Sequence, residues 1–182
     1  MNMITSTTKL PGVIVIEPVV FGDSRGLFKE LFKEPAYIRN GVDISFVQDN
    51  FSRSSKDVLR GLHFQIKKPQ GKLISVLSGC IFDVAVDIDP RSPSYCQWVG
   101  VELSDQNHKQ LWVPPGYAHG FCVLSESADV HYKCTALYDP ADEGGVYWAD
   151  KSIGVDWPTQ SPVISEKDTQ LPTLADYWTS RS

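Results

Sequence analysis

The chain has 182 residues, a length that predicts a single domain, residues 1–182, around one hydrophobic core. Hydrophobic residues make up 42% and charged residues 21%, a composition that excludes a disordered or collagen-like chain. The net charge of −5 argues against nucleic acid or an anionic membrane as a partner, and it leaves room for a small anion-binding pocket.

Short β-like runs fill most of the chain. Runs rich in Val, Ile, Phe, Tyr and Trp alternate with clusters of Gly, Pro, Asp and Ser, a pattern typical of strands and turns. In chain order, the predicted strands are residues 12–21, 27–32, 44–51, 58–65, 73–77, 80–88, 97–103, 110–113, 120–124 and 130–137. Only residues 35–40 and 174–178 look helical, and both stretches are brief.

Many short strands without alternating helices predict an all-β sandwich or barrel, and a jelly roll fits best. The C-terminal part has more Pro and polar residues and less alternation than the rest. We therefore expect an irregular C-terminal segment that lies over the barrel.

The N-terminus and the cysteines bear on the cellular compartment. Residues 1–10 are polar and lack the apolar stretch of a secretory signal. The four cysteines, Cys80, Cys96, Cys122 and Cys134, are widely spaced and form no C-x-x-C pair, which favours free thiols. Free thiols persist in a reducing compartment, so we expect a cytoplasmic location.

Polar side chains lie inside the otherwise apolar run FVQDNFSR at residues 46–53. Among them are Gln48, Asp49 and Asn50. Polar groups in such a run need hydrogen-bond partners, which are either neighbouring backbone groups or a ligand. Taken alone, this segment leaves both interpretations open.

Arg60 and His63 stand among apolar residues in the next predicted strand, and Lys72 follows a loop that contains Pro and Gly. Strict alternation points Arg60 and His63 to opposite faces of the sheet. If both serve one pocket, Gly61 is the natural place for a bulge that re-aims one of them. His63 is then either a hydrogen-bonded core residue or a general base, because imidazole titrates near neutrality.

A second histidine, His119, follows the rigid Pro-Pro-Gly turn at residues 114–116, and rigid turns are good mounts for functional side chains. Two histidines on different strands raise the question of a metal site. The sequence has no H-x-H pair and no carboxylate a few residues beyond His63 to complete a ligand set. We therefore predict no metal.

Tyrosines and acidic residues are frequent beyond residue 130. Tyr132 and Tyr138 belong to a strand-like run, where a tyrosine usually packs with its hydroxyl in water. Glu143 lies in turn-rich sequence, where loop solvation accounts for it. The SEKD sequence at residues 165–168, which contains Lys167 and Asp168, looks alone like an ordinary polar turn.

The combination of motifs is more informative than any one of them. The motifs are FGDSRG (21–26), FVQDNFSRS (46–54), LRGLHFQ (59–65), GKL (71–73), FDVAVDID (82–89), QWVGVELS (97–104), LWVPPGYAHGF (111–121), YKCTALYDP (132–140), IGVDWP (153–158) and SEKD (165–168). In this order they closely resemble the dTDP-4-dehydrorhamnose 3,5-epimerase family, over nearly the whole chain.

The resemblance implies a cupin-type jelly roll that works as a homodimer, with no metal or other cofactor. It implies a dTDP-sugar substrate, dTDP-4-dehydro-6-deoxy-D-glucose. Epimerisation at C3 and C5 would give dTDP-4-dehydro-L-rhamnose, a step of dTDP-L-rhamnose biosynthesis.

The resemblance also assigns roles to individual residues. His63 matches the base that removes the proton, Tyr132 the acid that returns it on the opposite face, and Asp168 the carboxylate paired with the base. Lys72 and Arg60 match residues near the keto oxygen and the phosphates. Further matches to nucleotide-sugar contacts are Arg25, Glu30, Gln48, Asp49, Asn50, His119, Glu143 and Lys167, and the aromatic rings of Tyr138 and Phe121 are suited to stack on thymine or sugar.

Three other functions remain as alternatives. A relative that epimerises only one carbon of a related sugar would share the same residues. A metal-dependent cupin would use His63 and His119 as ligands. A non-catalytic sugar-binding sandwich would bind the nucleotide sugar without exchanging its protons, and it gives no reason for the His, Tyr, Lys and Asp set.

Overall fold

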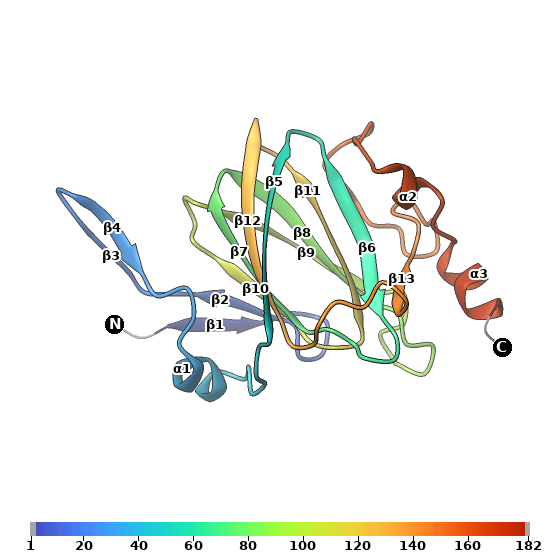
Figure 1. Ribbon diagram of the computed structural model, residues 1–182, viewed down its shortest axis with the longest axis horizontal. Helices are drawn as coiled ribbons and strands as arrows, with labels where there is room; N and C mark the ends of the chain where they lie inside the picture. The colour runs from blue at the N-terminus through green and yellow to red at the C-terminus, as the bar shows by residue number, and fades with distance from the viewer. Residues whose placement is uncertain (1–2, 181–182) are drawn as a thin grey trace.

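The computed structural model describes residues 3–180, which form two antiparallel sheets that face each other (Figure 1). The larger sheet has the order β1 (Ile4–Thr7), β2 (Ile14–Glu17), β10 (Gln110–Val113), β7 (Lys72–Ser78), β12 (Ser127–Cys134) and β5 (Gln48–Ser55). The smaller sheet has the order β13 (Glu143–Gly145), β6 (Leu59–Gln65), β11 (Tyr117–Val123), β8 (Cys80–Asp87) and β9 (Trp98–Ser104). The predicted jelly roll is confirmed.

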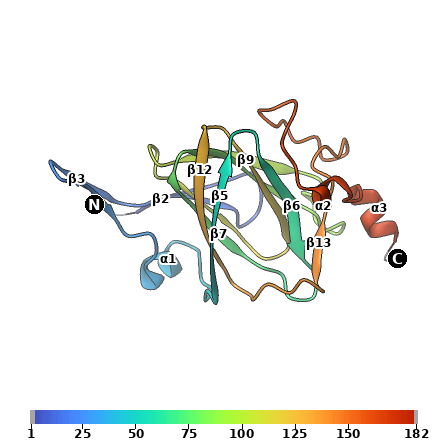
Figure 2. The ribbon, with the colours of Figure 1, turned by 45° about the horizontal axis from the view of Figure 1, so that its top comes forward.

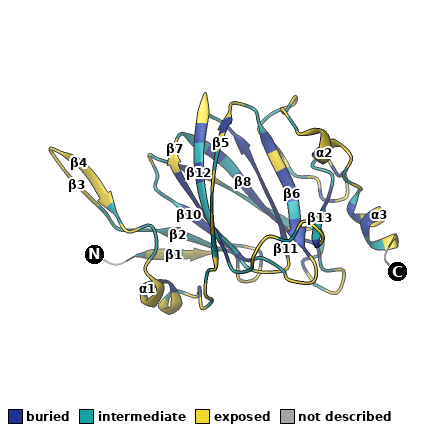
Figure 3. Ribbon diagram, in the orientation of Figure 1, coloured by how far each residue is buried: buried dark blue, intermediate teal, exposed yellow. Residues whose placement is uncertain are grey.

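A two-stranded hairpin, β3 (Val20–Asp23) and β4 (Gly26–Lys29), projects from the barrel (Figures 1 and 2). Three of its large apolar side chains, Phe21, Leu27 and Phe28, are more than half exposed. Figure 3 shows this hairpin as an exposed arm beside a largely buried barrel.

Three short helices lie outside the sheets. They are α1 (Glu34–Arg39), α2 (Glu166–Thr169) and α3 (Leu174–Thr179). The two predicted helices are confirmed as α1 and α3, whereas α2 occurs where the sequence indicates a turn. Ser165 explains the difference, because its hydroxyl caps α2 by accepting a hydrogen bond from the Asp168 N–H. No helix of residues 3–180 is both long and apolar enough to cross a membrane.

Apolar side chains from both sheets fill part of the barrel interior. Ile74 and Val130 of the larger sheet pack with Ala85, Leu103 and Phe121 of the smaller sheet. The outer face of the smaller sheet is covered by the C-terminal segment, as Trp157, Leu174 and Tyr177 pack in one cluster with side chains of β6 and β8. The predicted irregular segment over the barrel is therefore confirmed.

Two strand predictions differ most from the structure, whereas the ends of the others lie within about three residues of the predicted ones. The predicted strand at residues 12–21 is two strands, β2 and β3, because Pro18 has no backbone N–H to continue the ladder. The strand predicted at residues 44–51 is β5, which runs further along the chain. Phe46 instead packs edge-on against Phe32 and Trp112 outside the strand.

Two strands have no clear signal in the sequence. β1 has the sequence ITST, with a single large apolar residue, and β13 is Glu-Gly-Gly. Gly is unfavourable in strands, so propensity argues against β13. Its pairing with β6, where Gly145 lies opposite His63, is set by tertiary contact.

One irregularity in β6 decides where its side chains point. His63 pairs with His119 and Arg60 with Phe121, so three steps along β6 match two along β11. The extra residue is a bulge at the predicted position, because Gly61 has a φ of +129° and lies between these two pairs. Arg60 and His63 therefore face the same side of the sheet.

We expect Gly61→Ala to lower the free energy of unfolding by more than Gly26→Ala. Gly26 has a φ of +127°, so both changes carry a similar backbone cost, about 1–3 kcal/mol. A Cβ on Gly61 would also lie 2.6 Å from Gly120 Cα, whereas a Cβ on Gly26 meets no atom within 4 Å. This overpacking adds about 1–3 kcal/mol. Urea unfolding measures both losses, and equal losses would contradict the close approach of β6 and β11.

Candidate active site

A polar cavity lies between the two sheets. It consists of two adjoining hollows of about 410 and 280 Å³, and His63, Lys72 and Tyr132 line both of them. His63 comes from β6 of the smaller sheet, and Lys72 and Tyr132 come from β7 and β12 of the larger sheet (Figure 2). The cavity is thus walled by both sheets.

His63 forms a dyad with Asp168. The His63 Nε2 lies 2.7 Å from Asp168 Oδ1, and Asp168 is 3% exposed on α2. Burial raises the pKa of Asp168, but hydrogen bonds from His63, the Gly61 N–H and Ser165 lower it by more, so the net shift is downward. Asp168 is therefore an ionised carboxylate that accepts a hydrogen bond from the Nε2–H group of His63.

Tyr132 and Lys72 occupy the wall opposite His63. Burial raises the pKa of Tyr132, so its hydroxyl stays protonated at neutral pH. Burial lowers the pKa of Lys72, and the nearby Cys134, Asp83 and Glu143 oppose that shift. A cation in such a polar but shielded position interacts strongly with any negative charge that develops beside it.

Arg60 reaches the larger hollow from the same strand as His63. Its Nε donates to Ser54 Oγ over 3.0 Å, which leaves the terminal guanidinium nitrogens for another acceptor. This anchoring restricts the side chain, and guanidinium groups bind phosphate oxygens in a fixed fork geometry.

His119 lies beside His63 and has its own carboxylate partner. The two histidines are opposite each other in the β6–β11 ladder. His119 is 7% exposed and Asp83 is fully buried, and the His119 Nε2 lies 3.0 and 3.1 Å from the two Asp83 oxygens. Burial lowers the pKa of His119, with Asp83 opposing the shift, so the ring is neutral.

The smaller hollow is lined mainly by uncharged polar side chains. Gln48 Nε2 donates to Asn50 Oδ1 over 2.9 Å, and Gln48 Oε1 accepts from the Tyr138 N–H over 2.8 Å. The Tyr138 hydroxyl donates to Glu143 Oε2 over 2.7 Å. Lys167, on the wall of the larger hollow, forms an ion pair with the same Glu143 oxygen, so Glu143 connects the two compartments.

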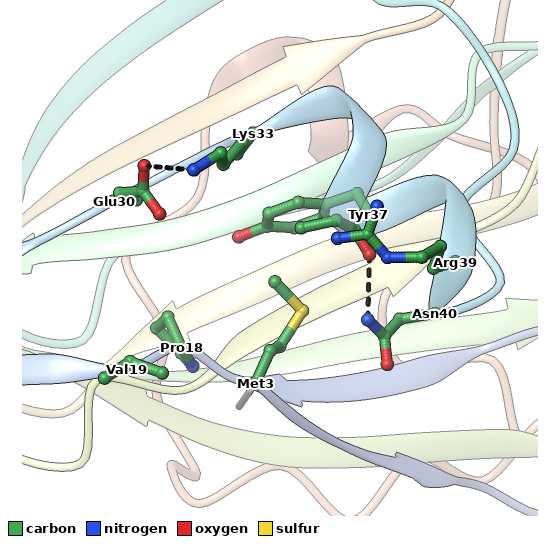
Figure 4. A pocket seen from close by; sticks show the side chains of 9 residues that line it. Met3, Pro18, Val19, Glu30, Lys33, Tyr37, Arg39 and Asn40 are labelled. Atoms are coloured by element: carbon green, nitrogen blue, oxygen red, sulfur yellow. Dashed lines mark hydrogen bonds and ion pairs between the residues drawn. The ribbon is translucent and has the colours of Figure 1, made fainter. Parts of the chain in front are cut away.

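Three predicted site residues lie away from this cavity. Asp49 points to the outer face of the larger sheet, where it accepts from Lys133 over 2.7 Å. Arg25 lies at the tip of the β3–β4 arm, with 88% of its side chain exposed and Asp23 as its partner. Glu30 pairs with Lys33 over 3.3 Å at a separate cavity of about 500 Å³ beside α1 (Figure 4).

Several residues at the cavity have no prediction from the sequence. Asp83 accepts a hydrogen bond from His119, and the cavity walls also include Ser52, Gln65, Gln70 and Cys134. The signal for Asp83 is a carboxylate inside the apolar run FDVAVDID. Within residues 3–180, the Ser52 hydroxyl oxygen is buried and has no hydrogen-bond partner, so it is available to a ligand.

The described residues contain no ligand set for the metal-dependent cupin considered above. Nowhere in residues 3–180 do three or more His, Cys, Asp or Glu side chains gather as they would around an ion. His63 and His119 each point a ring nitrogen at a separate carboxylate.

Comparison with known proteins gives consistent matches. The model of the dTDP-4-dehydrorhamnose 3,5-epimerase family matches residues 7–176. The dTDP-4-dehydrorhamnose 3,5-epimerase of Methanothermobacter thermautotrophicus is 52% identical over 172 residues, 93% of each chain, and that of Escherichia coli is 51% identical over 177 residues, 96% of this chain and 95% of the relative. A crystal structure of a dTDP-6-deoxy-D-glucose-3,5-epimerase from Legionella pneumophila in complex with dTDP-4-keto-L-rhamnose superposes with a TM-score of 0.93 at 48% identity, covering 96% and 94% of the two chains.

The jelly roll, with His63 of one sheet and Tyr132 of the other at one cavity and Asp168 of α2 paired with the histidine, has the fold and site of a cupin-type isomerase. The matched residues and the identities identify the particular family. The chain belongs to the dTDP-4-dehydrorhamnose 3,5-epimerase family.

We expect acid to destabilise the protein partly through His119. Its folded pKa is below the ordinary value of about 6.5, so below that pH the unfolded chain binds a proton that the folded chain does not. The free energy of unfolding should therefore fall as the pH falls from 7 to 5. His119→Gln keeps a donor for Asp83 but does not titrate, so its decline should be shallower in urea titrations. Identical slopes for the two proteins would contradict a neutral His119.

Proposed function

We propose that this enzyme inverts C3 and C5 of dTDP-4-dehydro-6-deoxy-D-glucose and forms dTDP-4-dehydro-L-rhamnose, as a step of dTDP-L-rhamnose biosynthesis. The observation that carries the proposal is the placement of His63 and Tyr132 on opposing sheets around one cavity. Inversion at carbon requires removal of a proton from one face and its return to the other. Two groups on facing walls meet this requirement.

The 4-keto group of the substrate makes both carbons reactive. The hydrogens on C3 and C5 flank the carbonyl, so removal of either gives an enolate whose charge falls mainly on the C4 oxygen. One base and one acid therefore serve both positions. Each positioned proton-transfer group typically contributes about 10²- to 10⁴-fold to the rate.

We assign the base to His63. Because Nε2 donates to the Asp168 carboxylate, Nδ1 carries the lone pair that accepts the substrate proton. Asp168 fixes this tautomer and stabilises the imidazolium that forms. We assign the proton donor to Tyr132, whose raised pKa keeps the hydroxyl protonated until the enolate takes its proton.

We assign the stabilisation of the enolate oxygen to Lys72, supported by Arg60. Lys72 lines both hollows together with the proposed base and acid, and an ammonium group fixed there needs no reorganisation when negative charge develops. The free end of Arg60 is suited to a phosphate oxygen of the diphosphate.

The remaining cavity residues are proposed to hold the nucleotide sugar. Gln48, Asn50, Tyr138 and Glu143 line the smaller hollow, where amides offer donors and acceptors and the half-exposed Tyr138 ring offers a stacking surface for thymine. Lys167 is suited to a phosphate, after it separates from Glu143. Asp49 is not part of this proposed set, because it binds Lys133 on the outer face.

We also propose a homodimer in which the β3–β4 arm reaches the partner. Arg25 and Glu30 match nucleotide-sugar contacts, yet neither lines the cavity of its own chain. The exposed Phe21, Leu27 and Phe28 on the arm form an apolar surface of the kind that a second copy covers. Such an arrangement would bring Arg25 to the substrate of the neighbouring subunit.

A cytoplasmic location is consistent with the cysteines. All four are free thiols, and Cys122 and Cys134 are buried. Burial also raises the pKa of Cys122 to about 11, which keeps that thiol protonated and unreactive.

In heavy water, the protein should place deuterium at both C3 and C5 of the 4-keto sugar. His63→Ala should reduce this exchange about 10²- to 10⁴-fold, because the base is lost. Mass spectrometry and proton NMR of the recovered sugar measure both sites. Exchange at neither carbon by the unmodified protein would refute the proposed function, and exchange at one carbon would assign a single-carbon epimerase.

Tyr132→Phe is the matched variant for the acid. It should still lose the proton through His63 but should invert the carbon poorly, so deuterium enters with retention. Full inversion by Tyr132→Phe would remove Tyr132 from the proposed role without affecting that of His63.

Light scattering should give the mass of a dimer, and Phe28→Asp should shift the protein toward monomer because a charge replaces apolar contact area. Arg25→Ala should leave the dimer mass unchanged and raise KM, since Arg25 lies at the exposed tip of the arm. A monomer at working concentration for the unmodified chain would contradict the proposed exchange of arms.

A further inference from the structure

Apart from its electrostatic effect on Lys72, Asp83 has no role in the reaction described above, although it is completely buried. It lies on β8 between apolar neighbours, and it does not line either hollow. Among residues 3–180, the hydrogen bonds of its carboxylate are those to His119 Nε2, at 3.0 and 3.1 Å.

A fully buried carboxylate is costly for the fold. Desolvation of a charge costs several kcal/mol unless its partners compensate, and an apolar residue would fit the neighbouring Val84 and Ala85 at no such cost. The carboxylate is therefore better explained by what it does to His119 than by packing.

Asp83 determines which nitrogen of His119 carries the proton. A carboxylate only accepts hydrogen bonds, so Nε2 must be the protonated nitrogen. Burial lowers the pKa of His119, and the nearby Lys72 and His63 act in the same direction, so the ring holds a single proton. The second nitrogen, Nδ1, is then free to bond a ligand.

The position of His119 indicates which part of the ligand it meets. His119 lies directly opposite His63 in the ladder, and side chains at such positions are close neighbours. It lines the larger hollow, with His63 and Tyr132, and does not line the smaller hollow that contains Tyr138 and Gln48. His119 therefore faces the hexose rather than the thymine.

We infer that Asp83 is a positioning residue, which holds the His119 ring so that Nδ1 hydrogen-bonds a hydroxyl group of the bound hexose. This inference depends on the proposed function, because it takes a dTDP-hexose as the ligand. It makes Asp83 a determinant of hexose binding that acts without touching the sugar.

Calorimetric binding of two ligands tests the inference. The ligands are dTDP-glucose, which carries the hexose hydroxyls but no keto group, and dTDP, which has no hexose. Asp83→Ala releases the ring and should weaken the binding of dTDP-glucose about three- to tenfold, which is the effect of one hydrogen bond. The affinity for dTDP should change by no more than about twofold.

Two controls separate positioning from general loosening. Asp87→Ala removes a second buried carboxylate of β8, one that binds Ser92 and Ser94, and should leave the ratio of the two affinities unchanged. His119→Ala should weaken dTDP-glucose as much as Asp83→Ala does, and the double variant should add little.

Equal weakening of the binding of both ligands by Asp83→Ala would overturn the inference. If the alanine variant does not fold, ¹⁵N NMR of the unmodified protein decides, since His119 must be protonated at Nε2 and not at Nδ1. An unmodified protein that binds neither ligand would instead refute the proposed substrate class.

Discussion

The extra residue at Gly61 is the constraint on which the site depends. Without it, Arg60 and His63 would point to opposite faces of β6, and one of them would enter the outer core. The bulge needs Gly on both strands, because a Cβ on Gly61 would lie 2.6 Å from Gly120 Cα and a Cβ on Gly120 would lie 2.7 Å from the Arg60 carbonyl oxygen. The same bulge directs the Gly61 N–H toward Asp168, so it shapes both members of the dyad.

The charged side chains that line the cavity do not reflect the net negative charge of the whole chain. The chain carries a net charge of −5, yet the cavity walls present Arg60, Lys72 and Lys167 to a ligand. The neighbouring carboxylates are each engaged: Asp168 by His63, Asp83 by His119 and Glu143 by Lys167. Lys167 is held by Glu143, so Arg60 and Lys72 are the cations of the cavity that the proposed diphosphate and developing enolate would meet first.

The sequence predicts the sheets and the dyad residues for different reasons. Alternation predicts most strands, and the Gly between Arg60 and His63 predicts the bulge. The pairing of His63 with Asp168, which are 105 residues apart, follows only from family resemblance, because no local pattern joins them. The alternation of side chains along β5 explains why Asp49 lies outside the cavity. Gln48 and Asn50 face inward, so Asp49 between them must face outward. No local signal places Arg25 on an arm beyond the barrel.

The short helix α2 carries two adjacent cavity residues, Lys167 and Asp168, on a segment that packs against the barrel from outside. Asp168 contacts β6 through hydrogen bonds from His63 and from the Gly61 N–H. The segment thus completes the larger hollow of the cavity, whose other charged and polar groups lie on the strands. Changes in the loops of this segment that keep Trp157, Leu174 and Tyr177 packed on the smaller sheet can alter the cavity while the sheets stay intact, so these loops are where new substrate preferences can evolve.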